Sequence, residues 1–111
     1  MAQVSFLELP VADLARSKAF YASAFGSDFT DFGPTYASTM RGAGDLGLQG
    51  DRAEQTAALL PVVTVDNLDA ALAAVSVAGG EITRAIFAFP GGRRFHFRDP
   101  DGHELAAMQT D

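Results

Sequence analysis

The chain has 111 residues, a length that predicts one globular domain with a single hydrophobic core. It contains no cysteine, which excludes disulfides, thiolate zinc sites and a cysteine nucleophile, and is typical of a cytoplasmic protein. The net charge of −6 disfavours nucleic acid as a partner, because an acidic surface repels phosphate. No apolar run resembles a signal peptide or reaches the length of a membrane span, so no membrane association is expected.

The amino-terminal residues predict a strand followed by an amphipathic helix. The segment 4–9 favours a strand and is bounded by Pro10, which cannot donate to a strand ladder. Asp13 is a candidate helix cap, and Gly26 stands where the helix is expected to stop. The expected apolar stripe of this helix comprises Leu14, Ser17, Ala19, Phe20, Tyr21, Ala24 and Phe25.

Three short strands are expected to complete the first half of the chain. They are predicted over 29–32, 36–41 and 46–49. Turns are expected between them at Gly33-Pro34 and at Gly42-Ala43-Gly44, because glycine and proline favour turn dihedrals. The polar segment 50–55 then connects the two halves.

The second half repeats the order of strand, helix and short strands. A strand is predicted over 59–65, and Asp66 or Asn67 is the expected cap of a helix that ends at Gly79-Gly80. The expected apolar stripe comprises Leu68, Ala71, Leu72, Val75 and Ala78. Strands are then predicted over 81–84, 86–89, 94–98 and 104–109, with turns at Gly91-Gly92 and over 99–102.

A shift of 54 residues aligns the two halves. It places Asp13 on Asn67, Leu14 on Leu68 and Gly26 on Gly80. In such a unit one helix covers one face of the sheet, so the second unit is expected to cover the other face and enclose a cup suited to a ligand. We therefore predict one α+β domain over 1–111, with modules over about 1–52 and 56–111.

Several segments in this order match a known family. They are Phe6-Leu-Glu-Leu-Pro-Val-Ala-Asp-Leu-Ala-Arg-Ser-Lys-Ala-Phe-Tyr21, Phe25-Gly26, Val65-Asp-Asn-Leu68 with Gly79-Gly80, and Phe97-Arg-Asp-Pro-Asp-Gly-His-Glu-Leu105. The chain resembles the vicinal-oxygen-chelate superfamily of glyoxalases, dioxygenases, epimerases and bleomycin-resistance proteins. The resemblance implies two β-α-β-β-β modules that form a curved, cup-shaped mixed sheet with helices on the outside. It also implies a homodimer.

Metal-dependent members of this family carry ligands on the first and last strand of each module. The corresponding positions here are Phe6, Leu60 and Ala106, which offer no lone pair to a metal. The fourth position lies near Leu48 to Gly50, where Gln49 is the only candidate donor. A register slip of one residue gives no better set, because it brings in Ser5, Leu7, Leu59, Pro61, Leu105 or Ala107. No metal and no cofactor are expected.

Glu8 and His96 are the candidate catalytic residues. Period two places Glu8 on the cup face with Phe6, where a carboxylate can bind a cationic or hydroxylated ligand or act as a general base. The alternative favoured for Glu8 is a solvated or arginine-paired position at the rim. His96 shares a strand face with Arg94 and Arg98, and a surface position is favoured for it over a role in binding or proton transfer.

The remaining candidates are residues that could line the cup or serve only the core. The full set expected to bind a ligand is Phe6, Glu8, Tyr36, Met40, Gln49, Leu60, Phe87, Phe89, His96 and Met108. Arg41 is a further candidate polar contact. His103 is expected to be an exposed turn residue, and Asp99 and Asp101 are expected to shape the turn without taking part in chemistry.

These observations favour a metal-free small-molecule-binding protein that sequesters a drug-like or cationic compound. The alternative is an enzyme of the same family that acts on a small carbonyl or thiohemiacetal substrate. It would be either a glyoxalase-type lyase with an unusual metal site or a metal-free isomerase that uses Glu8 or His96. A third hypothesis is a structural or regulatory domain whose cup has collapsed.

Overall fold

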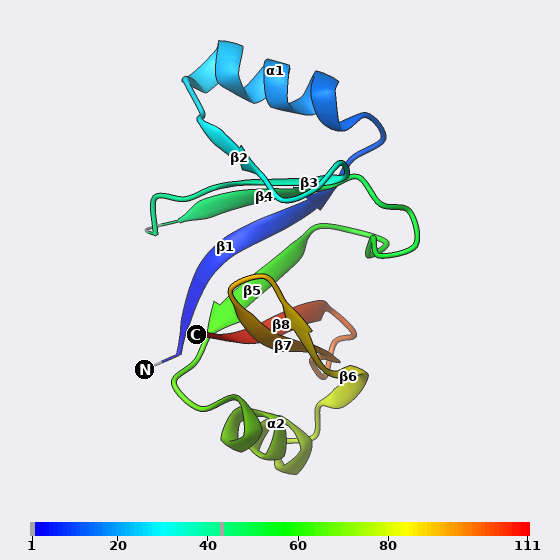
Figure 1. Ribbon diagram of the computed structural model, residues 1–111. Helices are drawn as coiled ribbons and strands as arrows, with labels where there is room; N and C mark the ends of the chain where they lie inside the picture. The colour runs from blue at the N-terminus through cyan, green and yellow to red at the C-terminus, as the bar shows by residue number, and fades with distance from the viewer. Residues whose placement is uncertain (1, 43) are drawn as a thin grey trace. The chain divides into compact units, whose positions relative to one another are not determined.

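The computed structural model describes residues 2–42 and 44–111. Its elements are β1 (Gln3–Pro10), α1 (Leu14–Phe25), β2 (Phe29–Asp31), β3 (Tyr36–Thr39), β4 (Asp45–Gln49), β5 (Leu60–Thr64), α2 (Leu68–Val77), β6 (Glu81–Phe89), β7 (Gly92–Arg98) and β8 (Glu104–Thr110) (Figure 1). The order β-α-β-β-β occurs twice, which confirms the predicted α+β class. No helix in the described ranges is long and apolar enough to cross a membrane.

The chain groups into two compact units. One is Phe6–Leu60, and the other is Pro61–Asp111 together with the amino-terminal residues through Ser5. β1 therefore contributes to both units. The Ser5 hydroxyl lies 2.6 Å from the Thr64 hydroxyl, and this hydrogen bond attaches the start of β1 to β5.

The sheet of the first unit has the strand order β2-β3-β4-β1. β2, β3 and β4 are antiparallel, whereas β1 runs parallel to β4 with Glu8 opposite Gly47. A Cβ placed on Gly50 would lie 3.5 Å from the Cβ of Leu14, so this side of β4 faces α1. Because successive strand residues alternate between faces, Glu8 and Gly47 face away from α1.

α1 begins and ends where the sequence predicts. Asp13 Oδ1 accepts a hydrogen bond from the backbone N–H of Arg16, and Gly26 ends the helix with a φ of 70°. The expected stripe was too wide, however, because Phe20 is 59% and Phe25 is 76% exposed. Successive helix residues are about 100° apart, so Phe20 lies on a different side of the helix from Leu14 and is exposed there. Phe25 is exposed at the end of the helix, where it is the last helical residue.

The strand before the turn between β3 and β4 ends two residues earlier than the sequence predicts. The strand predicted over 36–41 ends at Thr39, because the Asp45 carboxylate accepts hydrogen bonds from the backbone N–H groups of Arg41 and Gly42 and bends the chain there. Ala43, in the middle of the predicted turn, lies outside the described residues.

The sheet of the second unit has the order β5-β8-β7-β6, with β5 parallel to β8 and the other pairs antiparallel. Leu68, Phe95 and Ala107 form a buried hydrophobic cluster in this unit. The partly buried residues packed against them are Val65, Ala71, Leu72, Val75, Ile82, Ile86 and Phe97. Phe95 and Phe97 therefore face α2, and the alternation predicted for β7 places Arg94 and His96 on the opposite face.

β6 differs from the prediction of two separate strands. It is continuous from Glu81 to Phe89, with register shifts between Ile82 and Arg84 and between Arg84 and Phe87. Such bulges re-aim side chains without ending a strand. Ile82 and Ile86 thus reach the core beside α2, while Arg84 and Phe87 reach the face that carries His96.

Candidate functional site

Four residues from three strands of the first unit converge on one patch, which we call the Glu8 cluster: Phe6, Glu8, Tyr36 and Gly47. The Tyr36 hydroxyl donates a 2.9 Å hydrogen bond to Glu8 Oε1. A Cβ placed on Gly47 would overlap the Tyr36 hydroxyl and lie 3.6 Å from the Phe6 ring. Glu8 is only 1% exposed, so the solvated form of the favoured rim position is wrong, whereas its arginine-paired form stays a prediction.

A second cluster lies on the face of the second unit that points away from α2. His96 is 3% exposed, and its Nδ1 lies 3.5 Å from Glu104 Oε2. The same oxygen accepts a 2.9 Å hydrogen bond from the Thr83 hydroxyl. The favoured surface position of His96 is therefore wrong. The bulged β6 places the centre of the Phe87 ring 5.7 Å from the centre of the imidazole.

Two arginines complete this second cluster. The Arg84 guanidinium lies 3.7 Å from the centre of the Phe87 ring, and that of Arg94 lies 5.3 Å from Phe87 and 5.7 Å from Phe89. Cations over aromatic faces are attracted to the ring electrons. We call Thr83, Arg84, Phe87, Arg94, His96 and Glu104 the His96 cluster.

The sequence did not single out Thr83, Arg84, Arg94 or Glu104 as site residues. The alternation in 94–98 already placed Arg94 on the same face as His96, and that signal could have identified it. No comparable signal marks Thr83 and Arg84, because the bulges of β6 place them.

Of the other predicted ligand-binding residues, only some lie near these clusters. Met108 is opposite Arg94 in the β7–β8 ladder, and Leu60 is fully buried. Met40 follows the end of β3 and is 65% exposed. Gln49 is 8% exposed, and its Oε1 accepts a hydrogen bond from the backbone N–H of Asp51, so this side chain stabilises the loop after β4. A ligand-binding role for all ten residues stays a prediction.

The register of the two parallel strand pairs locates the fourth metal-ligand position of the family. Ala106 lies opposite Val62, and Gly47 lies opposite Glu8. Because Glu8 and Val62 are equivalent under the 54-residue shift, Gly47 is the counterpart of Ala106, and the position expected near Leu48 to Gly50 is corrected to Gly47.

The residues at the four positions do not fit a divalent metal. Phe6, Gly47, Leu60 and Ala106 have no side-chain lone pair to donate. The space above Gly47 is also filled by the Tyr36 hydroxyl, which leaves no room for a longer side chain there.

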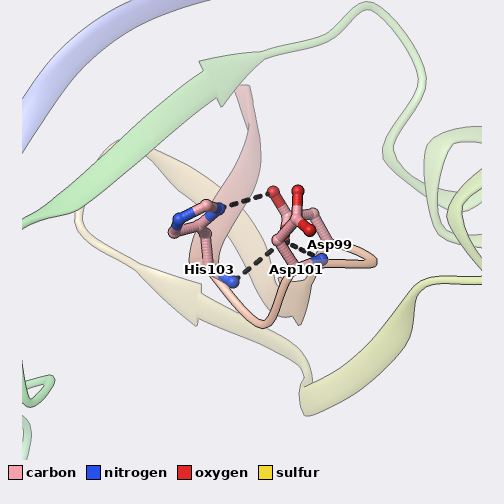
Figure 2. Close-up of side chains that lie close together, drawn as sticks. All are labelled: Asp99, Asp101 and His103. Carbon is pink, nitrogen blue, oxygen red and sulfur yellow. Dashed lines mark hydrogen bonds and ion pairs between the residues drawn. The ribbon is translucent and has the colours of Figure 1, made fainter.

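Asp99, Asp101 and His103 gather at the turn between β7 and β8, where the His103 ring is directed at the Asp99 carboxylate (Figure 2). Asp99 Oδ1 accepts hydrogen bonds from the backbone N–H groups of Asp101 and His103, and its Oδ2 lies 3.0 Å from His103 Nδ1. The His103 hydrogen bond lowers the pKa of Asp99, and the Asp99 carboxylate raises the pKa of His103.

The possible ligand atoms of these three residues lie within 4.8 Å of one another. Their contacts are nevertheless those of a turn that the Asp99 carboxylate stabilises by accepting hydrogen bonds from the backbone. The exposed position expected for His103 is confirmed.

Residues 3–107 match the family model of the Glyoxalase/Bleomycin resistance protein/Dioxygenase superfamily. No curated protein matches the sequence significantly.

Several solved structures are similar to this chain. One is described as an NAD-dependent benzaldehyde dehydrogenase from Legionella pneumophila (TM-score 0.78, 21% identity, covering 96% of this chain and 99% of that one). Another is methylmalonyl-CoA epimerase from Mycobacterium tuberculosis (TM-score 0.79, 14% identity, 96% and 87% covered). A third is the Mn(II)-bound glyoxalase from Novosphingobium aromaticivorans (TM-score 0.67, 21% identity, 98% and 40% covered). At these identities the similarity shows the fold alone.

Proposed function

Because this chain belongs to the glyoxalase/bleomycin resistance protein/dioxygenase superfamily and its metal-ligand positions carry no donors, we propose that it binds a small organic molecule without a metal ion. We further propose that the molecule is a drug-like cation and that the protein sequesters it. The observation that carries this proposal is the buried Glu8 carboxylate, which Tyr36 holds on the sheet face away from α1.

The chemistry of the Glu8 cluster supports a cationic ligand. A carboxylate in a poorly solvated position attracts a cation more strongly than a carboxylate in water, because less solvent screens the charges. Phe6 and Tyr36 add aromatic rings beside the carboxylate, and aromatic faces also attract cations. Aromatic surface with one placed charge is typical of small-molecule sites.

The test compares a planar aromatic cation with an aromatic anion. Berberine and 8-anilinonaphthalene-1-sulfonate both gain fluorescence in apolar sites, so each can be titrated directly. We expect Glu8→Gln, which keeps the shape of the side chain, to weaken berberine binding about tenfold or more and to leave the anion nearly unchanged. The matched control is Glu81→Gln, because Glu81 has a 70% exposed side chain at the start of β6. Berberine binding that is unchanged in Glu8→Gln would contradict the proposal.

A second candidate function is a metal-free isomerase or lyase acting on a small carbonyl or thiohemiacetal substrate. It is favoured by the His96–Glu104 contact, because a carboxylate at one imidazole nitrogen orients the ring for proton transfer at the other. A base of this kind would exchange the proton next to a carbonyl.

Proton exchange of this substrate class in D2O, followed by NMR, tests the second function. We expect His96→Gln to abolish exchange and the exposed His103→Gln to preserve it. Equal rates in wild type and His96→Gln would exclude His96 as the base.

We also propose a homodimer in the cytoplasm. The resemblance to the family and the exposed Phe20 and Phe25 of α1 support association, and the absence of cysteine suits a reducing compartment. Light scattering during gel filtration would test the dimer.

A further inference from the structure

We infer that Tyr36 and Gly47 act together as positioning residues for Glu8. This inference rests on the proposed function, in which the Glu8 carboxylate meets the ligand. It starts from the strand order β2-β3-β4-β1, which places β4 between the strands that carry Tyr36 and Glu8.

Tyr36 must cross a complete strand to reach Glu8. Adjacent strands lie about 4.8 Å apart, so β3 and β1 are separated by about twice that distance. Gly47 of β4 is the direct neighbour of Glu8, and Ser38 of β3 is the direct neighbour of Gly47. Tyr36 starts two residues before Ser38 on the same strand face, and its side chain reaches diagonally over Gly47 to donate to Glu8 Oε1.

The crossing requires glycine for space and not for backbone conformation. Gly47 is not among the glycines with positive φ, so its dihedral angles suit any residue. A glycine inside a strand weakens the strand and commonly marks a close approach. Here a Cβ would overlap the Tyr36 hydroxyl and lie 3.2 Å from the ring carbon that bears it.

The consequence is that the Tyr36 hydrogen bond restricts the direction of the Glu8 carboxylate. A glutamate side chain has three rotatable bonds. When these bonds rotate freely, a ligand binds with lower affinity, because binding must then order the side chain at a cost in conformational entropy. Tyr36 orders the carboxylate before the ligand arrives, and Gly47 keeps the path of Tyr36 open.

The experiment uses Tyr36→Phe, Gly47→Ala and the double variant in the full chain. We expect Tyr36→Phe to weaken berberine binding about tenfold, the value of one hydrogen bond to a charged group, with little change for the anionic dye. Gly47→Ala displaces the Tyr36 ring and is expected to weaken berberine to a similar extent. The double variant is expected to bind no more weakly than either single variant, because all three break the same hydrogen bond.

A comparison of stability with berberine affinity distinguishes a positioning role of Tyr36 and Gly47 from a role in packing alone. Gly47→Ala is expected to lower the urea midpoint, and removal of the hydroxyl in the double variant is expected to restore part of it without restoring berberine affinity. Tyr21→Phe is the matched control, because Tyr21 is the other tyrosine of the chain and lies on α1. An affinity that recovers together with stability in the double variant would overturn the inference.

A readout without ligand keeps this test apart from that of the proposed function. The carbon NMR signal of the Glu8 carboxyl, assigned by its loss in Glu8→Gln, is expected to shift in Tyr36→Phe and to stay in place in Tyr21→Phe. If the signal shifts but Glu8→Gln binds berberine normally, positioning stands and the proposed function fails. If neither the signal nor the affinity changes in Tyr36→Phe while Glu8→Gln loses binding, the function stands and the positioning role fails.

Discussion

Asp13 and Asn67 cap the two helices in the same way, 54 residues apart in the sequence. Asp13 has φ −139° and ψ 104°, and Asn67 has φ −138° and ψ 105°. Each side-chain oxygen accepts a hydrogen bond from the backbone N–H three residues on, which belongs to Arg16 in one module and Ala70 in the other. Two chemically different residues thus perform one structural task, as expected for two copies of one unit.

The shared capping geometry predicts equal costs for its removal. Asp13→Ala and Asn67→Ala should each lower the free energy of unfolding by about 1 kcal/mol, because one helix N–H loses its acceptor. Urea unfolding followed by circular dichroism measures both. Asp28→Ala is the control, because Asp28 is an exposed aspartate outside the helix caps. A loss in only one of the two cap variants would contradict the equivalence.

The two helices differ in how much their first residue is buried. Leu68 is fully buried in the core beside Phe95, whereas its counterpart Leu14 is only partly buried. Leu68→Ala should therefore lower the free energy of unfolding by about 3 kcal/mol through the cavity it leaves, and Leu14→Ala by less. Val77→Ala, at a position that is 89% exposed, should change it by less than about 0.5 kcal/mol. Similar losses for Leu14→Ala and Leu68→Ala would show that α1 is packed as tightly as α2.

The turn between β7 and β8 should respond to pH through Asp99 and His103. The pKa of His103 is raised above its ordinary value of 6.5, so the contribution of protonated His103 is complete below 6.5 and is lost as pH rises through the raised value. The pKa of Asp99 is lowered from 3.8, so its contribution is complete above 3.8 and is lost as pH falls through the lowered value. The pair should stabilise the turn most between these two ordinary values.

Proton NMR titration of the two histidines measures the shift directly. His103 should titrate at a higher pH in wild type than in Asp99→Asn, because the amide removes the negative charge beside the ring. The stability difference between wild type and His103→Gln should shrink on both sides of the mildly acidic window. An equal difference at all pH values would show that the ion pair contributes nothing to the turn.

The sequence alone determined the elements that depend on local chemistry. A side-chain acceptor before an apolar stripe favours the start of a helix through a hydrogen bond to a backbone N–H only three residues away. This local interaction is why α1 and α2 begin at the predicted residues. Alternation within 94–98 likewise fixed which side chains share a face, and Phe95 and Phe97 face the core as a pair. The loss of donor atoms at Phe6, Leu60 and Ala106 could also be read directly from residue identity.

Only the tertiary structure decided which residues contact the strand faces that carry Glu8 and His96. Alternation places Glu8 and His96 on a face but does not say which residues lie across from them, because those come from strands distant in sequence. Tyr36 reaches Glu8 over Gly47, and the bulges of β6 bring Phe87 to His96. Both candidate catalytic residues are buried, and the geometry of these non-local approaches is set by strand order and register and not by the local pattern of residues.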